Sequence, residues 1–253
     1  MVMRCRGFTL VELVITLVVL AILALGVTSY LGIGSRMYAD AALREQVLGQ
    51  SRFVAERLVR ELRNAVPNSV SFSLSSNCLQ FRPILYSGVY TSLPFEQSGI
   101  SMTVLSPGLA SVSPVTYATG SKPQLLVYPT AVANPGGTVV LNSISTQDAA
   151  AARFTLNFDS FRFTRQSPER RFYIADERVN YCIVSAGSGR FNMERRYAGN
   201  RVLMAEGLTS DQVFRVTEPV LTRNAVVNIL LRFGYDDSAD MFLNYEVHIP
   251  NVP

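Results

Sequence analysis

The first strong pattern along the chain is an apolar run close to the N-terminus. It extends over twenty residues, from Phe8 to Val27, and its only polar side chains are Thr9, Glu12 and Thr16. Twenty residues of α-helix span about 30 Å, the thickness of a bilayer's hydrocarbon core. A helix also satisfies its own backbone hydrogen bonds, as lipid requires. The run therefore predicts a membrane-spanning helix.

A second helical pattern follows the apolar run. Its apolar positions recur at helical spacing, with Ser51 in the one gap: Leu43, Val47, Val54, Leu58 and Leu62. Charged residues fill the positions between them, which is typical of an amphipathic helix docked on one face. Pro67 is expected to end this helix. Because no strong breaker precedes it, we expect one continuous helix, loosened around Gly32 and Gly34.

From Val70 onward the periodicity changes to that of short strands separated by turn residues. Alternating apolar and polar positions indicate strands at 154–158 and 179–184, and a final hairpin of 226–235 with 241–249. The fold class predicted is therefore α+β, with a long N-terminal helix packed on an antiparallel β-sheet domain.

Two further expectations concern how the strands are distributed. Residues 87–147 are rich in Ser, Pro, Gly and Thr, which predicts long loops with a few short strands, one of them at 124–128. Segments 167–174, 179–184 and 189–191 are expected to be successive strands of one sheet.

The residues before the apolar run carry positive charge in Arg4 and Arg6 and end at Gly7. A removed secretory signal peptide is the competing interpretation, but the run is longer than a usual signal core of about 7 to 15 residues. The segment after it also lacks a convincing small-x-small cleavage site. Membrane anchoring is therefore favoured.

Glu12 is the unusual residue of the apolar run. A carboxylate in a spanning helix costs roughly 2.5 to 3.5 kcal/mol at the helix centre and usually has a partner. Proximity to the headgroups and to the positive end of the helix dipole is one explanation. A cut between Gly7 and Phe8 is another, because it would create an α-amine four residues before Glu12, on the same helix face.

The segment from Gly7 to Leu13, Gly-Phe-Thr-Leu-Val-Glu-Leu, resembles the cleavage and methylation motif of type IV prepilins and of the pseudopilins of type II secretion. The resemblance implies that a prepilin peptidase cuts after Gly7 and methylates the amine of Phe8. It also implies that Glu12 docks the subunit into a filament. Many major pilins have a helix-kinking proline where this chain has Ser29.

The resemblance divides the chain into a leader peptide (1–7), a transmembrane helix (8–27), a periplasmic amphipathic continuation (28–66) and a mainly β globular domain (67–253). It implies a bacterial inner-membrane protein, single-pass, with its C-terminal domain in the periplasm and later in the pilus. The implied partners are the prepilin peptidase, other minor and major pilins, and the inner-membrane assembly platform.

The order of the C-terminal segments is similar to that of minor pilins of the MSHA (mannose-sensitive haemagglutinin) pilus. A minor pilin that primes or caps a pilus is therefore the leading expectation. A minor pseudopilin of type II secretion shares every N-terminal feature, and an adhesin or DNA receptor at the pilus tip is an alternative of another class.

Composition changes this picture in two respects. Removal of the leader leaves 21 basic and 19 acidic side chains, which gives little support for a nucleic-acid partner. Removal of the leader also leaves two cysteines, Cys78 and Cys182. In an oxidising periplasm they are expected to form a disulfide, and two separate buried thiols are the alternative.

Candidate chemistry beyond the N-terminus is sparse. His248 is the only histidine, and no nucleophile elbow or phosphate-binding loop occurs, so no enzyme activity and no cofactor are expected. The acidic turn with Asp236, Asp237 and Asp240 is a weak candidate for calcium, because its spacing does not fit an EF-hand.

One cationic segment is a candidate for nucleic acid or an acidic partner, through arginines interleaved with aromatic residues. Its members are Arg162, Arg165, Arg170, Arg171 and Arg178 with Phe161, Phe163, Phe172 and Tyr173. The alternative is an ordinary solvated sheet face.

Overall fold

The computed structural model of the protein describes residues 9–118, 120, 122–130, 136–217, 224–234 and 241–250. The described elements are one long α-helix, α1 (Leu10–Arg63), a short 3-10 helix, η1 (Pro107–Ser111), and fifteen β-strands. The chain divides into two compact units, Met1–Gly49 and Gln50–Pro253. Each unit is described by itself.

The first unit is the N-terminal part of α1. Its apolar side chains are largely exposed; Leu20 and Ile22, for example, are 61% and 65% exposed. In the described part of the chain, α1 is the one helix long and apolar enough to cross a membrane. It is helical at Gly32 and Gly34, which agrees with the predicted continuous helix. Two mid-helix glycines cost only about 1 kcal/mol each, too little to interrupt so long a helix.

The second unit begins with the last turns of α1, whose inner face is fully buried. Ser51, Val54, Leu58 and Leu62 are each 0% exposed, which confirms the predicted amphipathic stripe in this part of the helix. The helix ends at Arg63, just ahead of Pro67. It is continuous from the apolar run, as the pattern of residues predicts.

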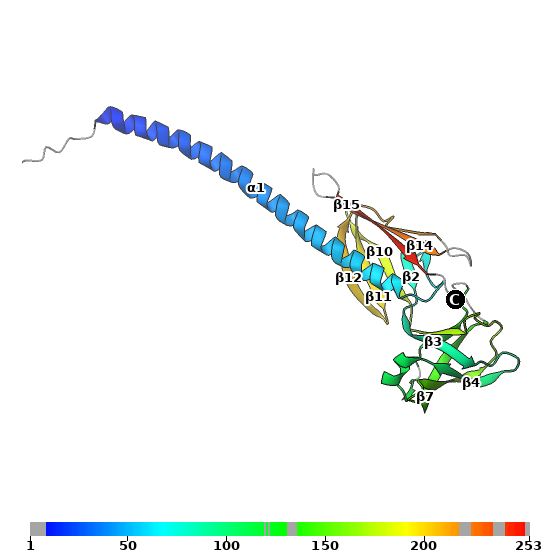
Figure 1. Cartoon of the computed structure of the whole chain (residues 1–253). Coiled ribbons are helices and arrows are strands. Elements are labelled where there is room, and N and C mark those ends of the chain that lie inside the picture. The colour runs from blue at the N-terminus through cyan, green and yellow to red at the C-terminus, as the bar shows by residue number, and fades with distance from the viewer. Residues whose placement is uncertain are drawn as a thin grey trace, which may run out of the picture. The chain divides into compact units, whose positions relative to one another are not determined.

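Eight strands form an antiparallel sheet, here called the framework sheet. They are β1 (Ser71–Ser73), β2 (Cys78–Phe81), β10 (Val179–Gly187), β11 (Arg190–Tyr197), β12 (Asn200–Leu208), β13 (Phe214–Thr217), β14 (Ala225–Phe233) and β15 (Met241–Ile249). Figure 1 shows β10, β11, β12 and β14 in this group. The hairpin of β14 and β15 pairs along its whole length, so the prediction of a final hairpin is confirmed.

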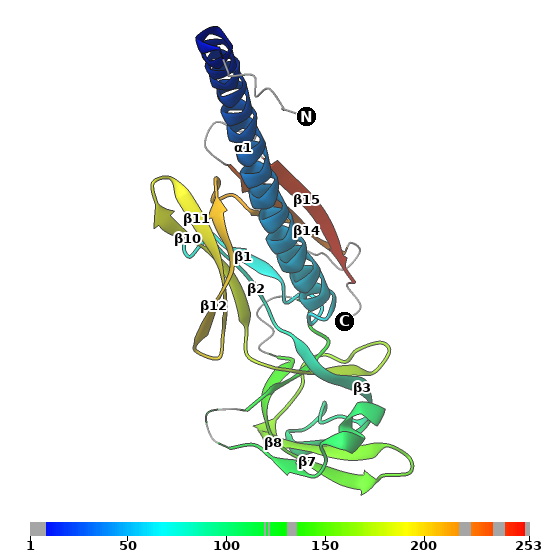
Figure 2. The same ribbon diagram turned by 90° about the vertical axis from the view of Figure 1, so that its left-hand side faces the viewer.

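The other seven strands form a closed antiparallel barrel. They are β3 (Ile84–Ser92), β4 (Gly99–Leu105), β5 (Val115–Thr116), β6 (Gln124–Val127), β7 (Thr138–Asp148), β8 (Arg153–Phe161) and β9 (Arg171–Ala175). Six of them pair in a ring, β3–β4–β8–β7–β6–β9 and back to β3, while β5 adds beside β7. Figure 2 shows β7 beside β8, the pair that completes the ring. Buried side chains such as Phe154, Leu156 and Phe172 fill a core of its own.

The barrel corrects two expectations. Residues 87–147 are not mainly loops, because they contain all of β4 and most of β3 and β7. Threonine is common in strands, and serine is tolerated where it alternates with apolar residues. A composition rich in these two residues therefore does not exclude strands. The three segments expected in one sheet are also divided: β9 belongs to the barrel, whereas β10 and β11 belong to the framework sheet.

The barrel is an insertion between two neighbouring strands of the framework sheet. β2 pairs directly with β10, and Phe81 lies opposite Val179. Residues 82–178 therefore leave the framework sheet after Phe81 and rejoin it beside Phe81, at Val179. The segment after α1 is hydrogen-bonded to the first residues of the insertion, here called its base. Val66 N donates to Arg82 O (2.9 Å), and Ile84 N donates to Asn64 O (2.9 Å). Val66 also packs in a small buried cluster with barrel residues. A closed barrel leaves no unpaired edge among the strands of its ring.

Candidate functional site

The helix start presents Glu12 in a defined local structure. Thr9 precedes the helix, and its Oγ1 accepts a hydrogen bond from the backbone N–H of Glu12 at 3.3 Å. The carbonyl of Thr9 accepts from Leu13 N at 3.2 Å. Thr9 is therefore the N-cap, and Glu12 occupies the third helical position, as in a capping box. The sequence analysis missed this cap, although the Thr-x-x-Glu spacing before an apolar run signals it.

The cap places the carboxylate in the first helical turn, where the positive end of the helix dipole favours negative charge. Gly7 and Phe8, the predicted cleavage and methylation positions, lie outside the described residues. They directly precede Thr9 in the chain. The predicted cut site and the helix start are thus separated by Phe8 and Thr9 alone.

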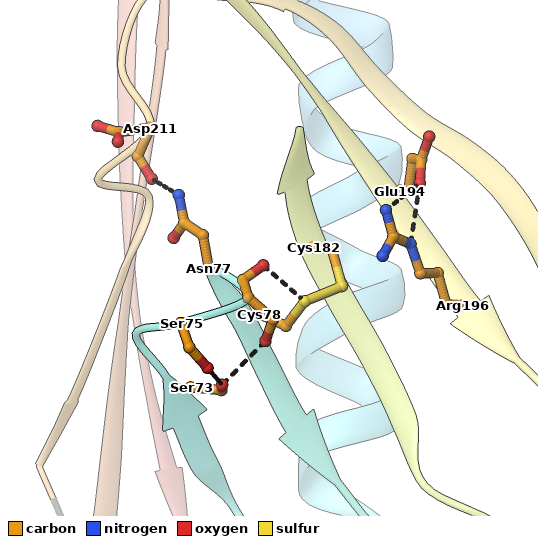
Figure 3. Close-up of a disulfide and its surroundings, with 9 residues drawn as sticks. Ser73, Ser75, Asn77, Cys78, Cys182, Glu194, Arg196 and Asp211 are labelled. Carbon is orange, nitrogen blue, oxygen red and sulfur yellow. Dashed lines mark hydrogen bonds and ion pairs between the residues drawn. A yellow bond between two sulfur atoms is a disulfide. The ribbon is translucent and has the colours of Figure 1, made fainter. Parts of the chain in front are cut away.

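Cys78 and Cys182 are joined by a disulfide across the pair of strands that carries the barrel (Figure 3). The two residues are directly opposite in the register of β2 and β10, and both are buried. The neighbouring Asn77 has a positive φ of 48°. Its carbonyl accepts from Ile183 N at 3.0 Å, and its side-chain amide donates to Asp211 O at 3.2 Å. The turn before β2 is therefore fixed on two sides.

A charged cluster docks the end of α1 on the framework sheet. Arg195 Nε on β11 lies 3.1 Å from both carboxylate oxygens of Glu61, and Arg57 Nε lies 3.1 Å from Glu61 Oε1. The Tyr181 hydroxyl is buried, with no hydrogen-bond partner in the described part of the chain. Burial, with the negative charge of Glu61 as a lesser cause, raises the pKa of Tyr181.

The cluster extends from Arg195 to the exit of the barrel. The Arg195 guanidinium lies 5.2 Å from the ring centroid of Tyr197, and the Tyr197 hydroxyl donates to Asp176 Oδ2. This hydrogen bond, followed by burial, raises the pKa of Tyr197 to about 12. Asp176 follows β9, so one line of contacts joins the helix, the framework sheet and the base of the barrel.

The predicted cationic segment does not form a stacking surface. Phe163 and Phe172 are 0% exposed and belong to the barrel core, and Tyr173 is 7% exposed. Arg171 pairs with Glu169 at 3.0 Å. Bases need accessible aromatic faces, so the expectation of arginines interleaved with exposed aromatics was wrong for these three rings.

The remaining candidates are the acidic turn and the histidine of the last hairpin. Asp236, Asp237 and Asp240 lie outside the described residues. Within the ranges that the structure describes, no group of three or more metal-ligating side chains occurs. His248 Nε2 lies 2.8 Å from Glu246 Oε1 on the exposed face of β15, an arrangement typical of a surface pair.

An exposed apolar helix with a capped acidic first turn is the arrangement expected at the start of a membrane-anchored pilin-like protein. Residues 2–28 match the prokaryotic N-terminal methylation motif. The match includes Gly7, Phe8 and Glu12, and it supports the class of type IV prepilins and pseudopilins for this chain. No curated protein and no solved structure matches the chain.

Proposed function

We propose that the chain is a minor type IV pilin-like subunit that takes part in pilus assembly and has a structural, non-enzymatic role. A prepilin peptidase removes residues 1–7 and methylates Phe8. The span 8–27 then holds the subunit in the bacterial inner membrane, with the β domain in the periplasm, until the subunit enters the pilus. The prepilin peptidase and other pilins are its partners, together with the assembly platform.

The observation that carries this proposal is the match of residues 2–28 to the methylation motif. The local structure of the described residues supports it. Thr9 caps the helix immediately after Phe8, and Glu12 lies in the first turn, where it can pair with a methylated α-amine. A carboxylate at this depth of an apolar helix needs such a partner.

The barrel favours a minor role over a major one. Residues 82–178 add a second folded body to the framework sheet. A subunit of this bulk is harder to repeat along a thin fibre than to place at its tip or in a priming complex. Together with the order of the C-terminal segments, this favours an MSHA pilus subunit resembling the minor pilin MshO.

A minor pseudopilin of type II secretion remains the second candidate, because it shares the motif, the helix and the acidic first turn. A DNA receptor at the tip is less well supported, since Phe163 and Phe172, which would stack with bases, are buried in the barrel. An adhesin role depends on a binding surface outside the N-terminal segment.

The processing step is tested by expressing the chain with and without a prepilin peptidase and sequencing the N-terminus by mass spectrometry. The expected product begins at N-methylated Phe8 only when the peptidase is present. A Gly7→Val variant is expected to keep its leader. A product that begins at Met1 despite an active peptidase would refute the proposal.

Pilus and secretion roles are separated by deletion of the gene. Surface pili and secreted proteins are then measured in the same strain. Loss of pili with normal secretion supports the pilus, whereas loss of secretion with normal pili supports the pseudopilin.

A further inference from the structure

A groove with a volume of about 930 Å³ lies on the framework sheet, where the turn before β2 faces β13 and the outer surface of the last hairpin. This volume is in the range of sites that bind small molecules and peptide segments. The groove is distant in sequence from the N-terminal segment, and nothing in the proposed assembly role uses it.

The floor of the groove consists of paired positions on adjacent strands. Arg215 on β13 lies opposite Asn228 on β14, and Leu230 on β14 lies opposite Asn244 on β15. Residues two apart on a strand share a face, and directly opposite residues share it too. The two carboxamides and Arg215 therefore surround Leu230 on one surface of the sheet.

The opposite side of the groove is an apolar wall with one amide. Phe72 and Leu74, from β1 and the turn after it, line this side, and Leu74 is 88% exposed. The ring of Phe72 lies 6.5 Å from that of Phe214 on β13. The disulfide at Cys78 and the two hydrogen bonds of Asn77 fix the wall. A preformed wall lowers the entropy cost of binding.

These groups combine two kinds of recognition. A carboxamide donates and accepts at the same time, so Asn228 and Asn244 can each pair with the N–H and C=O of a peptide backbone. Leu230, Phe72 and Leu74 offer aliphatic and aromatic surface for an apolar side chain. Arg215 and Asp211 both line the groove, and no ion pair joins them among the described residues. The Arg215 guanidinium can therefore donate to an acidic side chain or to a C-terminal carboxylate.

We propose that this groove binds an extended peptide segment of a partner protein, with an apolar side chain over Leu230 and a carboxylate at Arg215. The lining is mixed, with apolar side chains such as Phe72, Leu74 and Leu230 beside polar ones such as Asp211, Asn228 and Asn244. Leu74 and Leu230 present aliphatic surface that packs well against a Leu, Val or Phe side chain, and this favours a peptide over a sugar. The proposal does not depend on the pilus role, since it uses only the framework sheet.

The experiment uses the full chain in detergent micelles and an array of synthetic peptides of about eight residues, roughly 26 Å when extended. Half of the peptides carry one apolar residue and an acidic residue, and half carry polar and basic residues only. A panel of neutral oligosaccharides is tested in parallel. Apolar acidic peptides are expected to bind, and fluorescence anisotropy then gives their Kd.

Three variants identify the groove as the site. Leu230→Asp and the double change Asn228→Leu with Asn244→Leu are each expected to raise the Kd at least about tenfold. Arg215→Glu is expected to shift the preference from acidic to basic peptides. Arg201→Glu, at an exposed position on β12, is the matched charge control and should bind as the unchanged chain does.

Retention of the Cys78–Cys182 disulfide and of the melting temperature shows that each variant is folded. Failure of all array peptides to bind overturns the proposal, as does binding that is unchanged in the three groove variants. Binding of the oligosaccharides alone overturns it in favour of a carbohydrate site. None of these outcomes affects the processing test at Gly7 and Phe8, so the two proposals fail separately.

Discussion

Glu61 and Arg195, 134 residues apart in the chain, form the contact that fixes the end of α1 to the framework sheet. Arg195 Nε approaches both carboxylate oxygens of Glu61 at 3.1 Å, and the two side chains are only 15% and 19% exposed. Removing one member of a shielded pair leaves the other without its partner, which costs more than loss of a surface ion pair.

Glu61→Ala is therefore expected to lower the free energy of unfolding by about 1 to 3 kcal/mol. The measurement is urea unfolding of the full chain in detergent micelles, followed by the circular dichroism of its β-sheets. Glu56→Ala is the control, because Glu56 is exposed on the same helix and should change stability by less than about 0.5 kcal/mol. Equal losses in the two variants would contradict the docking role of Glu61.

Alkaline pH should lower the stability of the fold, because the hydroxyls of Tyr181 and Tyr197 ionise less readily in the folded chain than in the unfolded chain. The pKa of Tyr197 is raised to about 12 and that of Tyr181 is raised further still, from an ordinary value of about 10. Below pH 10 both states keep the hydroxyls neutral, so their contribution is fully present. Above pH 10 the unfolded chain ionises first, and stability is lost as the pH rises through the folded pKa.

We expect the melting temperature to fall between about pH 10 and pH 12, and to fall less in a Tyr181→Phe and Tyr197→Phe double variant. The pH dependence of melting checks this. The control is Tyr30→Phe, a change at an exposed position of α1. A double variant with the same pH dependence as the unchanged chain argues against these two groups.

The disulfide closes a loop of 104 residues in sequence. Reduction is expected to lower the free energy of unfolding by about 4 to 5 kcal/mol, the loop-entropy value for a loop of this length. Urea unfolding with and without reductant measures the change. In a Cys78→Ser and Cys182→Ser double variant, reductant should have no further effect; a further loss would show that reductant acts elsewhere.

The contrast between helix and barrel shows what the sequence could and could not predict. The spacing of Val54, Leu58 and Leu62 predicts the docked helix because a helix buries one continuous stripe, and this periodicity is local. Closure of the barrel pairs β4 with β8 and β3 with β9, and the pairing of β2 with β10 spans residues 82–178. Such pairing depends on non-local contacts, which no local pattern records.

The same distinction applies to the candidate site. Gly7, Phe8 and Glu12 form a compact local motif, so the sequence alone is enough to predict them as a site. The buried positions of Phe163 and Phe172 depend on which face of the barrel they occupy. An alternation of arginine and aromatic residues indicates that the strand has two different faces. It does not indicate which face is buried in the core.

Glu12→Ala tests the carboxylate of the first turn directly. The variant is expected to insert into the membrane and be processed at Phe8, since neither step needs the charge, yet to be lost from sheared pili. An immunoblot of the sheared and cell-bound fractions measures this. Glu12→Asp, which keeps the charge, should retain part of the assembly. Normal amounts of the Glu12→Ala variant in pili would remove the docking role.

The barrel should fold without the rest of the chain. Its six-stranded ring is closed by β7 and β8, its core is formed by its own side chains, and its two ends meet at Phe81 and Val179. A fragment of residues 83–177 is therefore expected to be folded and to unfold cooperatively. Near-UV circular dichroism and urea unfolding provide the measurement.

The matched variant within this fragment is Gly88→Ala. A Cβ at Gly88 would lie 2.3 Å from the carbonyl oxygen of Leu105 on β4, so the two strands would have to move apart. We expect a loss of about 1 to 3 kcal/mol. Gly108→Ala is the control, because its Cβ would meet only the Tyr86 ring at an ordinary 3.6 Å. An unfolded fragment would show that the barrel needs Val66 and the segment after α1, which cover its base in the whole chain.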